Sequence, residues 1–152
     1  MGQQQLLLLV LGIVIVGLAV VVGIQAFGEN QKKANSDALV NDAVRIASDA
    51  QAWKLKPAAF GGGGDANGMT GFTLEGVGYD IAGGSDSGKY DNLNGVFDIA
   101  PAATSLVITA TNVSSNNEVQ VGVFGTTPDC IVTQIGAIGA VTAPAAPTTC
   151  KF

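Results

Sequence analysis

The sequence predicts an α+β fold, in which a long N-terminal helix packs by its second half on a small antiparallel sheet. Residues 1–28 contain no charged side chain, and the residues that follow repeat apolar side chains at helical spacing. Beyond residue 71, short segments with alternating apolar and polar side chains indicate strands. We therefore divide the chain into an apolar helix (1–28), its amphipathic continuation (29–56), a Gly-rich loop (57–71) and an antiparallel β head (72–152).

The first element is the uncharged stretch from Leu6 to Ile24, which holds six Leu, six Val, three Ile, three Gly and one Ala. As a helix it would measure about 28 Å, close to the hydrocarbon thickness of a bilayer. A cleaved secretory signal is the alternative. No Lys or Arg precedes the stretch, however, and the candidate cleavage position after Ala26 is weak. We therefore expect a helix that inserts into the membrane.

The second element, residues 30–56, has the period of an amphipathic helix. No polar break separates it from the apolar stretch, so the two are expected to join in one helix of about 55 residues, roughly 80 Å long. Pro57 and the run "GGGGDANG" end this helix, and we interpret the glycine run as a linker. The stripe expected to pack on the sheet consists of Leu39, Ala43, Ile46, Ala50 and Trp53.

The β head is expected to contain several short strands. Apolar and polar side chains alternate best at 105–113 ("SLVITATNV") and 118–125 ("EVQVGVFG"), which predicts an antiparallel hairpin closed by "SSNN". Shorter strands are expected at 72–82 and 94–100, and a last strand at 130–139.

The two cysteines, Cys130 and Cys150, bracket nineteen residues rich in Ala, Pro and Thr. We expect them to form a disulfide, which would tie this segment down and place the β head in an oxidising compartment. Two independent free thiols are the alternative.

Composition excludes several classes of function. The chain has no His, so the commonest general base and metal ligand is absent, and no motif gives a Ser or Thr nucleophile a base. We therefore expect that the chain is not an enzyme. Residues 57–152 carry two Lys against eight carboxylates, which argues against nucleic-acid binding. "GGGGDANG" lacks the Lys-Ser/Thr of a phosphate-binding loop, and we expect no cofactor.

Oxygen-bearing side chains are dense between residues 80 and 98, and they make a weak Ca²⁺ candidate. Their spacing does not match the EF-hand loop, and turn formation by Asp and Asn explains them without a metal. We therefore expect no metal site. The candidate ligands are Asp86, Asp91, Asn94 and Asp98.

The order of elements resembles the type IV pilins and the related pseudopilins. The shared features are a charge-free helix that starts after Gly2, its amphipathic continuation, a loop, an antiparallel sheet and a C-terminal Cys pair. The resemblance implies that Gly2 precedes a processing cut and that the apolar helix lies in the membrane before assembly. It implies that the filament core is then packed by Leu6, Leu9, Gly12, Ile13, Val16, Gly17, Val20, Gly23, Ile24 and Phe27.

The resemblance implies a structural role for the chain. The chain would be the major subunit of an extracellular, pilus-like helical filament for adhesion, motility or cell contact. Its partners would be identical subunits and the pilus assembly machinery. A pseudopilin of a secretion system is one alternative, and a monomeric single-pass membrane-anchored binding protein is another. Lys32 and Lys33 alone would favour a cytoplasmic head, whereas the expected disulfide and the pilin-like layout favour an external one.

Overall fold

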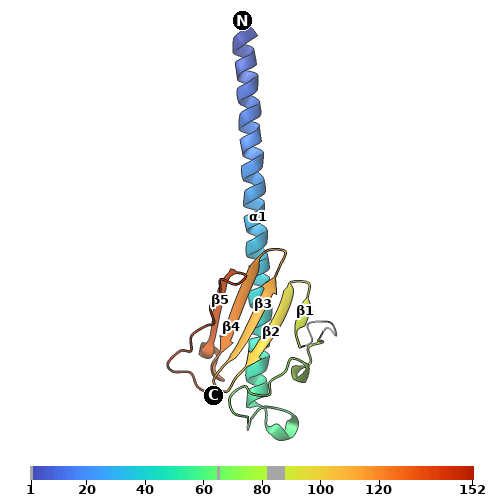
Figure 1. Ribbon diagram of the computed structural model, residues 1–152, viewed down its shortest axis with the longest axis vertical. Helices are drawn as coiled ribbons and strands as arrows, with labels where there is room; N and C mark the ends of the chain where they lie inside the picture. Colours follow the sequence, from blue (N-terminus) through green and yellow to red (C-terminus); the bar gives the residue numbers. More distant parts are fainter. Residues whose placement is uncertain (1, 65, 82–87) are drawn as a thin grey trace. The chain divides into compact units, whose positions relative to one another are not determined.

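The computed structural model describes residues 2–64, 66–81 and 88–152 (Figure 1). The chain divides into two compact units, one that ends at Ala34 and one that comprises residues 35–152, called the head unit below. The head unit combines the C-terminal part of helix α1 with a five-stranded antiparallel sheet. The predicted α+β class is therefore confirmed.

Helix α1 (Gly2–Leu55) joins the apolar stretch and the amphipathic stretch in one helix, as expected. No proline lies within residues 2–55, and the polar residues at 28–37 do not end the helix. It ends just before Pro57, which has no backbone N–H and adopts an extended conformation with ψ at 147°. A single 3₁₀ turn, η1 (Ala58–Phe60), follows.

The sheet is a meander in which each strand pairs with the next along the chain. The strands are β1 (Tyr90–Asn92), β2 (Gly95–Pro101), β3 (Leu106–Asn112), β4 (Asn117–Val123) and β5 (Ile131–Ala137). All four pairings are antiparallel, so tight turns suffice to connect β1 to β2 and β3 to β4. The strands expected at 94–100, 105–113, 118–125 and 130–139 are confirmed.

The prediction of a strand at 72–82 is wrong. Its centre is a 3₁₀ turn, η2 (Glu75–Val77), stabilised by a hydrogen bond from the backbone N–H of Gly76 to Thr73 Oγ1. Gly78, with φ at +91°, then turns the chain out of an extended path. Ile81 forms a single isolated bridge to Tyr90. Local turn chemistry therefore outweighed the apolar pattern.

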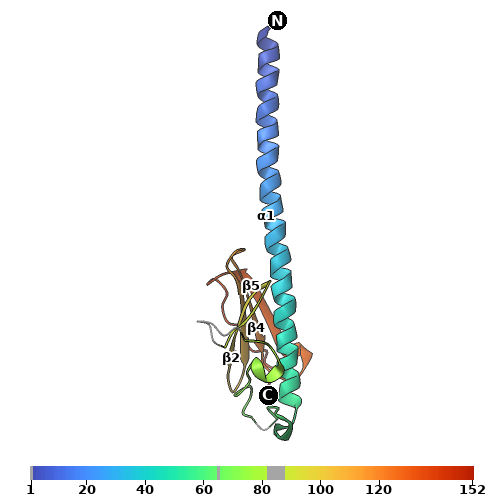
Figure 2. The ribbon, with the colours of Figure 1, turned by 90° about the vertical axis from the view of Figure 1, so that its right-hand side faces the viewer.

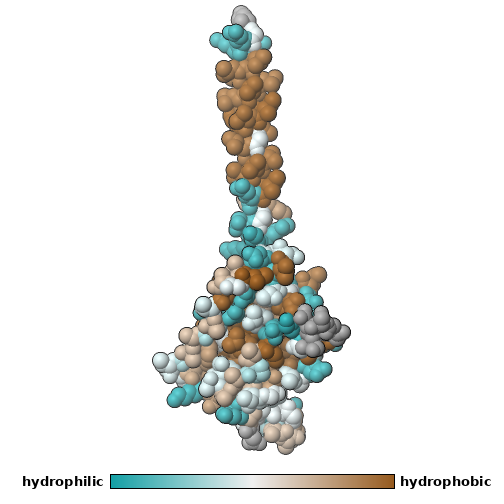
Figure 3. Space-filling model, in the orientation of Figure 1, coloured by the Kyte–Doolittle hydropathy of each residue, from teal (hydrophilic) through white to brown (hydrophobic). Residues whose placement is uncertain are grey.

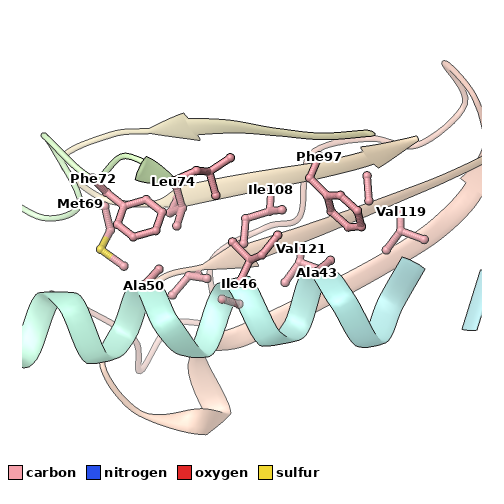
Figure 4. Packing of buried hydrophobic residues seen from close by; sticks show 14 of the residues in the cluster. Ala43, Ile46, Ala50, Met69, Phe72, Leu74, Phe97, Ile108, Val119 and Val121 are labelled. Atoms are coloured by element: carbon pink, nitrogen blue, oxygen red, sulfur yellow. The ribbon is translucent and has the colours of Figure 1, made fainter. Parts of the chain in front are cut away.

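The core of the head unit lies between α1 and one face of the sheet (Figures 2 and 4). Successive strand residues alternate sides, so Leu106, Ile108 and Ala110 of β3 all point to the buried face. Figure 4 shows the α1 residues Ala43, Ile46 and Ala50 directed toward this face. Other fully buried members of the core are Leu39, Ala47, Met69, Phe72, Leu74, Phe97, Val119, Val121 and Val123.

The Gly-rich loop that follows α1 packs against the end of that helix. A Cβ on Gly63 would lie 2.2 Å from the ring of Trp53, so only glycine lets the backbone pass this close. Lys54 Nζ donates hydrogen bonds to the carbonyl oxygens of Gly63 and Ala66, at 2.9 and 2.6 Å. The loop is thus held by the helix that it follows.

The C-terminal segment is tied to the opposite face of the sheet. The disulfide between Cys130 and Cys150 is formed, which confirms that expectation. It is buried in a small cluster with Phe124, against which Val132 of β5 packs. Both oxygens of the buried Glu118 carboxylate accept hydrogen bonds, one from Gln120 Nε2 and one from the backbone N–H of Gly139.

Candidate functional site

The most conspicuous surface of the chain is the N-terminal part of α1, where large apolar side chains are exposed. The side chains of Leu6, Ile13, Val20 and Ile24 are 67, 65, 55 and 69 % exposed, and Phe27 is 67 % exposed. Figure 3 shows this segment as a band of hydrophobic side chains. Apolar exposure on this scale in a folded chain marks a surface that meets lipid or protein.

The residues expected to pack in a filament core all lie in this exposed segment. Leu9 and Val16 are each 63 % exposed, and open space surrounds the position where a Cβ would stand on Gly12, Gly17 and Gly23. Their role in a filament core stays a prediction.

The segment has the physical properties that membrane insertion requires. Within the described residues, α1 is the one helix long and apolar enough, by length and composition, to cross a membrane. A helix satisfies its backbone hydrogen bonds internally, so only side-chain polarity decides whether lipid tolerates it. A signal sequence shares these properties. The disulfide, for its part, is typical of an oxidising, extracytoplasmic environment.

Inside the head unit, an asparagine network fixes α1 to two hairpin turns. Asn35 Oδ1 accepts hydrogen bonds from Ser115 Oγ at 2.6 Å and Asn117 Nδ2 at 3.2 Å. Asn35 Nδ2 donates to the carbonyl oxygen of Asn94, which also accepts from Asn112 Nδ2. The sequence analysis missed this network. The density of Asn in both turns is the signal that could have indicated it.

Two turns further along α1, a carboxylate completes the attachment of the β1–β2 turn. Asp42 Oδ2 accepts hydrogen bonds from Asn92 Nδ2 at 2.9 Å and from Asn94 Nδ2 at 2.7 Å. Asn92 Oδ1 in turn accepts from the backbone N–H groups of Asn94 and Gly95. These side chains are therefore engaged in holding the hairpin on the helix.

At the other end of the head unit, Gln51 binds the loop that leads to the disulfide. Its side chain is buried, and Nε2 donates to the carbonyl oxygens of Gly125 at 2.8 Å and Thr127 at 2.9 Å. Thr127 lies next to the disulfide, since its Oγ1 is 3.2 Å from Cys130 Sγ. Sequence periodicity could not have identified this role, because a Gln between two apolar positions carries no sign of its partner.

The Ca²⁺ candidates are not brought together where the structure describes them. Asp91 pairs with Val96 in register, and Asp98 follows Val96 by two residues, so both carboxylates lie on the sheet face away from α1. Asn94 instead binds Asp42 of α1. Asp86 lies outside the described residues. Within the described residues, no group of three or more Asp, Glu, His or Cys is placed to hold a metal ion.

A shallow depression lies between the C-terminal part of α1 and the turn η2. Asp49, Trp53 and Lys56 line it together with Glu75. Nearby, Tyr79 donates a hydrogen bond to Asp49 Oδ2 at 2.5 Å. Burial, together with that hydrogen bond and the negative charge of Asp49, raises the pKa of Tyr79 above its usual value. Tyr79 is not among the residues that line the depression. These residues include charged side chains, and none of them carries a hydroxyl or a thiol that could act as a nucleophile.

Comparison with family models, curated proteins and solved structures found no match to this chain. Inferences about its function therefore rest on the sequence and on the geometry described above. Gly2 begins α1, and open space surrounds the position of its Cβ. A processing cut after Gly2 stays a prediction.

Proposed function

We propose that the chain is the major structural subunit of an extracellular, type IV pilus-like filament, and that its apolar N-terminal helices pack together in the filament core. The observation that carries this proposal is the exposure of residues 6–27 on a helix that also builds the core of the head unit. Such a helix needs a partner along its apolar part, and lipid or identical helices can supply it.

The apolar segment is unstable in water and needs lipid or protein around it. Moving one Leu, Ile or Val side chain out of water contributes about 1.5–3 kcal/mol, and the segment exposes more than a dozen of them. In the membrane these side chains contact lipid, so assembly exchanges lipid for neighbouring helices rather than water for protein. The glycines allow close approach of neighbouring backbones.

The head unit has the features that an exposed subunit surface requires. A disulfide closes its C-terminal segment, and hydrogen-bond networks attach its hairpin turns and the disulfide loop to α1. These ties keep the head unit folded outside the cell, where reducing agents are absent. The filament would serve adhesion, motility or cell contact.

The direct test is electron microscopy and intact-mass analysis of material sheared from the cell surface. Regular fibres that contain this chain would support the proposal, and the mass would show whether Met1 and Gly2 have been removed. Recovery of the chain only as a monomer in membrane extracts would contradict it and would favour a single-pass anchored protein. Short fibres retained in the cell envelope would favour a pseudopilin.

A matched pair of variants tests the role of the apolar segment. We expect the double variant Ile13→Ala, Val16→Ala to lower the temperature at which sheared fibres dissociate, because it removes apolar contact from the filament core. The control, Leu93→Ala with Val113→Ala, removes the same number of carbon atoms from exposed hairpin turns. Equal dissociation temperatures for the two would contradict the proposed core.

A further inference from the structure

Beyond Ile131, which packs against the core, the helix-facing side of β5 is left uncovered in the head unit. Thr133 and Ile135 lie opposite Val121 and Val119 in the register of β4 and β5, so all four point to the same face of the sheet. Val119 and Val121 are fully buried under α1, whereas Ile135 is 57 % exposed. Figure 1 shows α1 crossing the middle of the sheet while β5 lies at its edge.

Two valines of α1 border this uncovered strip. Gln51 binds carbonyl groups between β4 and β5, so its side of α1 is turned toward β5. Val44 and Val40 precede Gln51 by seven and eleven residues, two and three helical turns, and therefore lie on the same side. Both are half-buried. The β5 shelf is defined here as Val40, Val44, Thr133, Ile135 and Ala137.

The chemistry of the β5 shelf points to an apolar partner. None of its five residues is charged, and residues 131–142 contain no charged side chain at all. Edge strands of soluble proteins usually carry charges or prolines that prevent unwanted pairing, and β5 has neither. A partner that fits must itself be apolar and uncharged.

We propose that the β5 shelf binds residues 6–27 of a second copy of this chain. Among the described residues, 6–27 is the longest run of exposed apolar side chains, and it carries no charge. In the proposed filament, neighbouring subunits supply this segment. This inference rests on the proposed filament and names one of its contacts.

The size of the shelf sets the size of the contact. From Thr133 to Ala137 the strand rises by about 13 Å, which matches two to three turns of a packed helix. Each contact is therefore small. A filament repeats it at every subunit, so its loss affects the whole polymer.

The first experiment compares filaments of Ile135→Lys with those of Val113→Lys in the full-length chain. Ile135 lies on the shelf, whereas Val113 is 84 % exposed in the β3–β4 turn, away from it. We expect about tenfold fewer filaments for Ile135→Lys and near-normal yield for Val113→Lys, because one buried Ile changes an equilibrium by about that factor. Melting of both purified variants in detergent would verify that the subunits stay folded.

The second experiment places a photo-crosslinking amino acid at position 135 in assembled wild-type-like filaments. We expect crosslinked dimers whose tryptic maps join position 135 to the peptide that ends at Lys32 of another copy. The same probe at position 113 is the control. Crosslinks from position 135 to other head residues, or to no protein, would overturn the inference, as would normal assembly of a folded Ile135→Lys subunit.

These results separate the inference from the function on which it rests. Absence of filaments in the wild type contradicts the proposed function itself. Filaments that form normally, with no crosslink from position 135 to the apolar segment, contradict the β5 shelf alone.

Discussion

Gln51 provides the sharpest stability test of the head unit, because one buried side chain binds the loop before the disulfide. In Gln51→Leu, the carbonyl oxygen of Gly125 loses its donor inside the protein. The carbonyl oxygen of Thr127 keeps one, the backbone N–H of Cys130. Orphaning one buried carbonyl costs about 1–3 kcal/mol, and losing the second bond about 0.5–1.5 kcal/mol. We therefore expect a loss of about 2–4 kcal/mol in the free energy of unfolding.

The isosteric variant Gln51→Glu adds a pH dependence with a definite sign. A buried carboxylate facing two carbonyl oxygens is disfavoured, so the folded state raises the pKa of this Glu above its unfolded value of about 4.3. The folded state then binds more protons than the unfolded state, and the stability of the variant falls as pH rises above about 4. A protonated Glu has one O–H donor where the Gln amide has two N–H donors, so Gln51→Glu should lose one hydrogen bond near pH 4 and be strongly destabilised at pH 7.

Urea unfolding of the full-length chain in detergent, followed by the fluorescence of the single tryptophan, measures these effects. Trp53 packs edge-on against Phe72 in the core, with ring centroids 5.4 Å apart, so it reports on folding of the head unit. Gln134→Leu is the matched control. It removes a bond of 3.3 Å to Thr142 at the surface and should cost less than about 0.5 kcal/mol. Equal midpoints for Gln51→Leu and Gln134→Leu, or a pH-independent Gln51→Glu, would refute the reasoning.

Three further predictions use the same unfolding assay. Cys150→Ser should lower stability by about 3 kcal/mol, because the disulfide closes a loop with a sequence separation of 20; wild type treated with reductant should match it. Gly68→Ala should cost more than Gly71→Ala. Both glycines have positive φ, but a Cβ on Gly68 would lie 1.8 Å from a carbonyl oxygen whereas Gly71 has open space. Because burial and the bond to Asp49 raise the pKa of Tyr79, the stability contributed by its neutral form is complete below about pH 10 and falls progressively as the pH rises further. Tyr79→Phe should lack this alkaline loss in a pH series.

The sequence alone determined the elements whose signals are local. An uninterrupted apolar stretch followed by apolar steps of three and four predicts a single helix, because helical periodicity needs no knowledge of the partner. The stripe from Leu39 to Ala50 could be named for the same reason, and the structure places Leu39, Ala43, Ile46 and Ala50 in the core. Strict alternation likewise located β3 and β4.

Only the tertiary structure decided the features that join distant segments. Residues 72–82 have a strand-like composition, yet turn chemistry at Thr73 and Gly78 prevents a strand. The roles of Asn35 and Gln51 depend on atoms 59 to 82 residues away in the sequence, which no local pattern encodes.

The two surfaces proposed for assembly, residues 6–27 and the β5 shelf, differ in the same way. Residues 6–27 could be recognised in the sequence because an uncharged helical stretch of that length is unusual in a soluble protein. The β5 shelf could not be, because "TQIGA" reads as an ordinary half-buried strand. Its exposure follows from where α1 crosses the sheet, and the width that a helix can cover is set by packing in three dimensions rather than by the order of residues.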